Sequence, residues 1–327
     1  MAVGNSLVKK DQVQRSSLTV YLANDAVRNQ INSVVGGKNG ARFISSIVSA
    51  VQVNPALQEC TNPSIVSAAL LGESLNLSPS PQLGQYYMVP YDNSKKGVKE
   101  AQFQLGYKGY IQLAIRSGQY KKLNVLAIKE GELVRFDPLN EEIEVHLIED
   151  EELREEAPTA GYYAMFEYTN GFRKALYWSK RKMLAHADKY SKAFFIKETT
   201  LKTKRGTKTR VSFADFEAGN YPKEDEWMYS SFWYKDFDGM AYKTMLRQLI
   251  SKWGIMSVEM QTAVNADMAV IREDGSMDYV DNASDDVYAD YEMSEADETD
   301  QTAAEPERKA KAEEMASALS ADDDFFN

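Results

Sequence analysis

The sequence predicts an α+β protein built from antiparallel hairpins and amphipathic helices. Two observations carry this prediction. Runs rich in aromatic and β-branched residues alternate with polar turn sequences between residues 86 and 178, which is typical of hairpins. Apolar residues recur at helical spacing on both sides of this part, in residues 41–53 and again up to about Trp253. We therefore expect strands in the middle of the chain and helices that pack on them.

The N-terminal part is polar, and Gly36, Gly37 and Gly40 interrupt any helix there. We expect residues 1–40 to form an arm followed by a flexible joint. Such an arm is a candidate for contacts between subunits.

Two helices are predicted after the arm. The first covers residues 41–53, where the apolar side chains share one face. The second begins at Asn62-Pro63, with Asn62 as the N-cap and Pro63 in the first turn, and it ends near Asn76.

Strands dominate the next hundred residues. A hairpin is predicted from residues 86–91 and 102–107, which flank a polar turn. Further strand candidates are residues 123–128 and 142–148. The clearest hairpin joins residues 162–168 to residues 172–178 through Asn170-Gly171, because both turn residues tolerate a positive φ.

Helices return after this hairpin. Ser179 is expected to cap a basic helix over residues 180–191. Residues 197–226 show little apolar periodicity and are expected to be a long loop. Asp236 or Asp238 then caps a last core helix that ends near Trp253 and is stopped by Gly254.

The net charge of −11 conceals a division of the chain. Residues 267–327 hold 20 acidic and 4 basic residues, whereas residues 1–266 hold 34 basic and 29 acidic residues. Within the body, residues 137–157 hold ten acids and one base, so the rest of the body carries +14. We expect three parts: the arm 1–40, a basic core 41–266 suited to a polyanion, and a largely disordered acidic tail 267–327.

Several classes of function find no support in the sequence. No apolar run approaches the length of a bilayer, the N-terminus lacks the apolar stretch of a signal peptide, and Cys60 is the single cysteine. We therefore expect a cytoplasmic protein that has no membrane among its partners. No phosphate-binding loop for ATP is present, and His146 and His186 lack a metal-ligand spacing, so we expect no cofactor.

A basic surface is the strongest functional pattern. Residues 171–210 hold thirteen Lys and Arg but only two acids. Lys182, His186 and Lys189 are spaced to share one helix face, and Lys243 and Arg247 lie one turn apart on the last helix. Two such faces over one sheet could form a groove along a phosphate backbone.

A second candidate is the segment from Gly106 to Tyr110, where a strand is expected to pass into a helix. Its glycines permit close backbone approach, its lysine can meet a phosphate and its tyrosines can stack on bases. The candidate DNA-binding residues are Tyr107, Lys108, Tyr110, Arg116, Lys182, His186, Lys189, Lys192, Lys243 and Arg247.

Three stretches carry a resemblance to a known family. They are residues 69–77 with the strand that follows, residues 105–118, and residues 243–249 with Lys252-Trp253. They resemble the phage RecT single-strand annealing proteins, which are distantly related to the Redβ type. The order and spacing agree over roughly residues 40–265.

This resemblance implies an antiparallel β-sheet core backed by helices, the fold of single-strand annealing proteins. It implies ATP-independent, non-catalytic annealing of complementary strands in phage homologous recombination. Single-stranded DNA and the annealed duplex would be bound in a basic groove on a homo-oligomer, as a ring or helical filament. A partner 5′–3′ exonuclease would expose the strand. By motif position, Lys108, Lys243 and Arg247 are the expected DNA contacts.

The C-terminal end adds one possible partner. Asp322 to Asp324 precede Phe325-Phe326, which resembles the acidic tip of bacterial single-strand-binding proteins. We expect this tip either to imitate that peptide in partner recruitment, with the host single-strand-binding protein as a further partner, or to fold back on the DNA groove. A merely solubilising tail is the plain alternative.

Two other functions stay open. A Mg²⁺-dependent nuclease would use Asp236 with Asp238 or the acids of residues 224–226. An acidic-tailed adaptor or scaffold would have no DNA contact.

Overall fold

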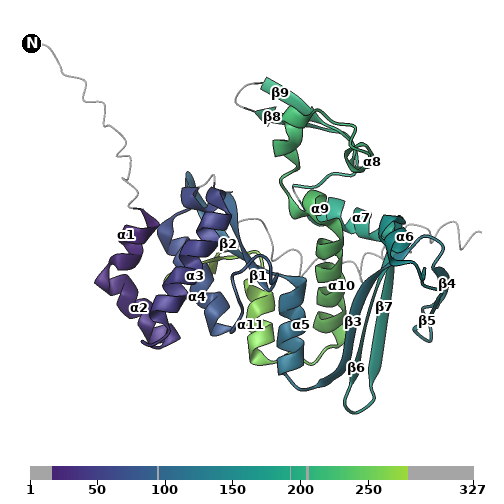
Figure 1. Cartoon of the computed structure of the whole chain (residues 1–327), viewed down its shortest axis with the longest axis horizontal. Coiled ribbons are helices and arrows are strands. Elements are labelled where there is room, and N and C mark those ends of the chain that lie inside the picture. Colours follow the sequence, from purple (N-terminus) through teal and green to yellow (C-terminus); the bar gives the residue numbers. More distant parts are fainter. Residues whose placement is uncertain (1–16, 94–95, 192, 204–205, 279–327) are drawn as a thin grey trace, which may run out of the picture. The chain divides into compact units, whose positions relative to one another are not determined.

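A three-stranded antiparallel sheet in the order β3-β6-β7 is the largest sheet of the structure, a computed structural model that describes residues 17–93, 96–191, 193–203 and 206–278 (Figure 1). All these residues belong to the first of the chain's two units, which ends at Asp278. The other sheets are two-stranded, and every pairing between the labelled strands is antiparallel. The predicted α+β class with antiparallel sheets backed by helices is confirmed.

The strands form five sheets in the described residues. Their bounds are β1 (Tyr86–Asn93), β2 (Val98–Leu105), β3 (Tyr120–Lys129), β4 (Leu133–Asp137), β5 (Glu142–Val145), β6 (Thr159–Tyr168), β7 (Arg173–Ser179), β8 (Thr199–Thr203), β9 (Gly206–Arg210), β10 (Val270–Ile271) and β11 (Met277–Asp278). The hairpins β1–β2 and β6–β7 and the strands β3 and β5 lie where the sequence predicts them.

The helices include several short ones that the sequence patterns did not predict. Their bounds are α1 (Leu18–Ala23), α2 (Asp25–Val35), α3 (Gly40–Val53), η1 (Pro55–Glu59), α4 (Asn62–Ser74), α5 (Tyr107–Arg116), α6 (Glu151–Glu156), α7 (Lys180–Tyr190), α8 (Phe213–Glu217), η2 (Lys223–Tyr229), α9 (Phe232–Lys235), α10 (Phe237–Trp253) and α11 (Val258–Ala266). No helix among the described residues is both long enough and apolar enough to span a bilayer.

One face of the three-stranded sheet carries helices α7 and α10. Side chains alternate along β6, so Tyr162 and Phe166 share a core with Met183 of α7 and Met245 of α10, all fully buried. The predicted caps are present: the Ser179 hydroxyl accepts from the Lys182 amide, and Asp236 accepts from the Gly239 amide. These caps and this core fix both helices on the same sheet.

The opposite face of the sheet is covered by the β4–β5 hairpin. Its inward side chains, Leu133, Ile143 and Val145, pack against Tyr163 of β6. The buried carboxylate of Glu132 accepts from Arg154 at 2.6 Å and so ties α6 to the start of β4.

Three predictions about the chain path need correction. The expected arm contains α1 and α2, because Leu22, Val27 and Ile31 gain burial there. The expected loop 197–226 folds into the β8–β9 hairpin, α8 and η2. The body extends past residue 266: Ala269, for example, is fully buried, and its carbonyl accepts from the amide of Phe103 in β2.

Two local details also differ. The β6–β7 turn is one residue longer than a two-residue Asn-Gly turn, because the Tyr168 amide donates to the Phe172 carbonyl and only Gly171 has a positive φ. The N-cap of α4 is Thr61, one residue before the predicted Asn62.

Candidate nucleic-acid interface

Helix α7 presents the predicted basic face. Lys182 and Lys189 are exposed, whereas Met183 and Ala187 on the other side are buried against the sheet. His186 is half-buried between the rings of Trp178 and Tyr190, at centroid distances of 5.4 and 4.6 Å. Of the three residues predicted to share a basic face, Lys182 and Lys189 are thus exposed, whereas His186 is held between two aromatic rings.

Positive charges from α7 and α10 converge around His186. The pKa of this imidazole is lowered to about 4, first by burial and then by the charges of Arg247, Lys182, Lys189 and Lys252. Its Nδ1 is buried without a hydrogen-bond partner among the described residues. We call Lys182, Lys189, Arg247 and Lys252 the α7–α10 basic surface.

The low pKa of His186 predicts a pH-dependent stability. Below about pH 6.5, the ordinary value, the unfolded chain binds a proton at His186 that the folded chain does not take up until about pH 4. The free energy of unfolding should therefore fall as the pH drops through this window. Urea unfolding at pH 7 and pH 5 should show a smaller loss in His186→Phe than in the parent; an equal loss would contradict this assignment.

Lysines of this region lie over aromatic rings. Lys182 Nζ is 4.6 Å from the centroid of Trp178, and Lys189 Nζ is 5.2 Å from that of Tyr190. Lys174 Nζ lies 4.6 Å from the centroid of Trp253, whose residue is 40% exposed at the end of α10. Trp178 is buried and Tyr190 is half-buried, so Trp253 is the ring of these three that is exposed for a base to stack on, with a cation beside it. Trp253 is not among the DNA-binding residues predicted from the sequence, although it follows Lys252 on the predicted helix.

Lys243 and Arg247 are turned toward a buried carboxylate. Lys243 Nζ lies 2.8 Å from Asp267, and Arg247 lies 3.8 Å from the other oxygen of that side chain. Asp267 also accepts from the Leu105 amide at 2.9 Å. Lys243 is only 7% exposed, so the expectation that it belongs to an exposed basic face needs correction.

The Gly106–Tyr110 segment packs mainly against the protein itself. A Cβ at Gly109 would meet the Gln85 carbonyl oxygen at 2.2 Å, so this glycine admits the neighbouring backbone. Tyr110 is fully buried, and its ring therefore cannot stack on a base in this structure. Tyr107 is half-buried against Tyr242 at 5.6 Å, whereas Lys108 is exposed on the first turn of α5.

The remaining candidate DNA-binding residues do not belong to the α7–α10 basic surface. Arg116 is exposed at the end of α5 and donates to the Leu75 carbonyl at 2.8 Å. Lys192 lies outside the described residues. In the basic stretch that follows, Arg210 is buried and donates to the Met228 carbonyl, and Lys208 pairs with Asp225.

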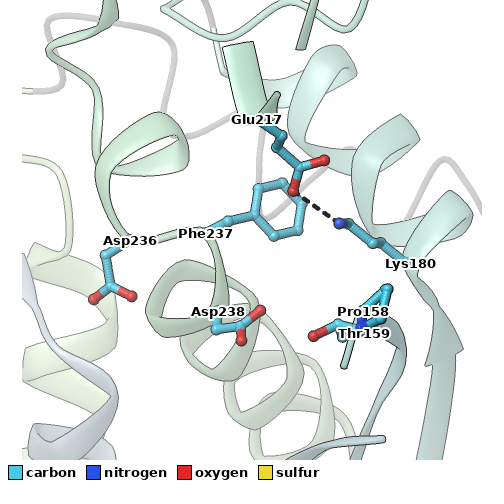
Figure 2. Close-up of a pocket in the computed structure, with 7 residues that line it drawn as sticks. All are labelled: Pro158, Thr159, Lys180, Glu217, Asp236, Phe237 and Asp238. Carbon is cyan, nitrogen blue, oxygen red and sulfur yellow. Dashed lines mark hydrogen bonds and ion pairs between the residues drawn. The ribbon is translucent and has the colours of Figure 1, made fainter. Parts of the chain in front are cut away.

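A pocket of about 510 Å³ lies where α7 and α10 begin (Figure 2). Each of its carboxylates has a protein partner: Asp236 caps α10, Asp238 accepts from the Tyr162 hydroxyl at 2.6 Å, and Glu217 accepts from Lys180 at 2.8 Å. Within residues 17–278, as far as they are described, no group of three or more His, Cys, Asp or Glu is arranged to hold a metal. Capping thus accounts for Asp236, which the nuclease alternative would have used.

The RecT family model matches residues 41–301. The chain belongs to the RecT family. It is 36% identical over 312 residues to the uncharacterized protein YqaK of Bacillus subtilis (strain 168), covering 93% of this chain and 91% of that protein. It is 27% identical over 258 residues to Protein RecT of Escherichia coli (strain K12), covering 78% of this chain and 81% of that protein.

Membership of the RecT family supports single-strand annealing in DNA recombination, with binding of single-stranded DNA and oligomerisation. The resemblance seen in residues 69–77, 105–118 and 243–249 is thereby confirmed.

Proposed function

We propose that this RecT-family protein holds a single strand by its phosphates on the α7–α10 basic surface and pairs it with the complement without ATP. The convergence of Lys182, Lys189, Arg247 and Lys252 around His186 carries the proposal. Phosphate contacts position a strand without reading its sequence, so its bases stay available for pairing. Lys108, on the first turn of α5, is a further candidate contact.

Pairing supplies the energy that retains the second strand. Each base-pair step adds about 1.4 kcal/mol of stacking. The contact of one subunit with DNA can then be weak, because neighbouring subunits in a ring or helical filament add their contacts. The absence of a Gly-x-x-x-x-Gly-Lys-Ser/Thr loop from the sequence supports annealing without ATP.

Salt dependence tests the electrostatic part of this proposal. If four cations each neutralise one phosphate, the affinity for single-stranded DNA should fall about 50-fold between 50 and 200 mM salt, since single strands give a slope of about −0.7 per phosphate. Fluorescence anisotropy of a labelled oligonucleotide measures this change. An affinity that does not respond to salt would contradict phosphate binding by this surface.

The proposed partners follow from the activity. An exonuclease that degrades 5′–3′ would supply the single strand, and a host single-strand-binding protein would be met on it. The C-terminal tip that would serve such recruitment lies outside the described residues. The annealing core would begin near residue 41, as predicted, and would continue to Asp278, where the first unit of the chain ends, and the acidic residues after Asp278 would form the tail.

A further inference from the structure

Exposed acidic and apolar side chains occur together in the β4–β5 hairpin and in helix α6, whose backbone Figure 1 shows. Leu139 is 92% exposed, Leu153 59%, Val134 53% and Leu147 49%. Residues 137–157 contain ten acids and a single base. We call residues 133–156 the acidic platform. The four aliphatic residues lie between positions 134 and 153, and exposed aliphatic residues that are grouped rather than scattered mark an interaction surface.

Hydrogen bonds and ion pairs attach the acidic platform to the three-stranded sheet. Arg154 joins the buried Glu132 at 2.6 Å and donates to the Ala127 carbonyl at 2.9 Å. Glu141 accepts from the Ala175 amide of β7 at 3.0 Å and also pairs with Lys174. Contacts at both ends therefore hold the platform on the sheet, and its outer side chains are presented in a fixed arrangement.

The charge of the platform selects its partner. Its carboxylates repel a phosphate backbone, so DNA is excluded as the occupant. The rest of residues 1–266 carries +14, which makes a second copy of this chain electrostatically complementary. Occupation by a second copy also suits the oligomerisation that the RecT family implies.

Helices α1–α3 offer a matching surface. Within residues 18–53, Arg28, Lys38 and Arg42 are exposed, and Asp25 is the single acid in that sequence. Exposed aliphatic side chains accompany these cations, and they are Val20 at 63%, Val34 at 51% and Val53 at 64%. Each surface thus combines exposed aliphatic side chains with charged ones. The acidic platform is negative and the surface of α1–α3 is positive, so the two are complementary.

We propose that the acidic platform of one copy docks on helices α1–α3 of a second copy. The two patches differ, so the contact is head-to-tail and repeats from copy to copy, which generates a ring or a filament. This inference rests on the proposed oligomer and names the surfaces that build it.

Cross-linking between single-cysteine variants tests the contact. Cys60 is only 2% exposed, so thiols introduced by Leu139→Cys and Val34→Cys react selectively. A short bismaleimide should join the two variants when they are mixed, and a chain with both changes should give a ladder. Leu83→Cys, at a position 50% exposed and in neither patch, serves as the control partner for Leu139→Cys.

A charge swap gives an independent readout. Glu149→Lys/Glu155→Lys/Glu156→Lys changes exposed carboxylates and should lower the mass of the oligomer in sedimentation. Mixing this variant with Arg28→Glu/Arg42→Glu should restore larger species. If the charge-swap variant kept the full oligomer mass and no cross-link formed between Cys at position 139 and Cys at position 34, the proposed docking surface would be wrong. Annealing by an oligomer would then still stand. A protein that stays monomeric with and without DNA would overturn both.

Discussion

Replacing Asp267 with alanine should lower the free energy of unfolding by about 3–5 kcal/mol, because the change leaves a buried cation without its counter-ion. Asp267 is 2% exposed, pairs with Lys243 at 2.8 Å and accepts from the Leu105 amide at 2.9 Å. It therefore ties the end of α11 to both α10 and β2. Urea unfolding followed by circular dichroism measures the loss.

Two further variants make this prediction specific. Lys243→Met should be less damaging, since Asp267 keeps Arg247 and the Leu105 amide as neighbours. Glu226→Ala, at an exposed site, should change stability by less than about 0.5 kcal/mol. If Asp267→Ala were as stable as Glu226→Ala, the buried ion pair would have no structural role.

Removing three lysines of the α7–α10 basic surface should weaken binding of single-stranded DNA about 10- to 100-fold, since exposed ion pairs contribute up to about 1 kcal/mol each. The change is Lys182→Ala/Lys189→Ala/Lys252→Ala. The salt slope should fall by about 2 at the same time, because three fewer phosphates are neutralised. Anisotropy titrations at several salt concentrations give both quantities.

A matched control separates position from net charge. Lys197→Ala/Lys223→Ala/Lys235→Ala removes the same charge from exposed residues that lie outside this surface. This control variant should bind single-stranded DNA with nearly the affinity of the parent and with nearly the same salt dependence. Equal weakening by both triple variants would mean that DNA responds to overall charge and that α7 and α10 form no defined site. Lys243→Ala is a poor test, because its burial couples binding to folding.

Features set by nearby residues could be predicted from the sequence. Ser179 and Asp236 each cap their helix through the amide three residues onward, and the positions of Lys182 and Lys189 on one face of α7 follow from spacing alone. Features that depend on contacts between residues distant in the sequence could not be predicted in this way. The partner of Lys243 is Asp267, which lies within the acidic C-terminal segment of the sequence and gave no indication of burial.

The N-terminal helices show the same limit. Helices as short as α1 and α2 are marginal in water, and burial of Leu22, Val27 and Ile31 on neighbouring elements supports them. Tyr110 likewise belongs to the core, although its glycine-flanked motif is compatible with either a core or a DNA-binding tyrosine. The burial of the side chain decides between a core role and a DNA-binding role, and the periodicity of the sequence alone does not reveal that burial.

The most direct test of the account is annealing of two complementary oligonucleotides added one after the other, without nucleotide. The parent should pair them rapidly, Lys182→Ala/Lys189→Ala/Lys252→Ala should pair them much more slowly, and Lys197→Ala/Lys223→Ala/Lys235→Ala should match the parent. Failure of the parent to retain or pair DNA without ATP, or undiminished annealing by the first variant, would contradict the account.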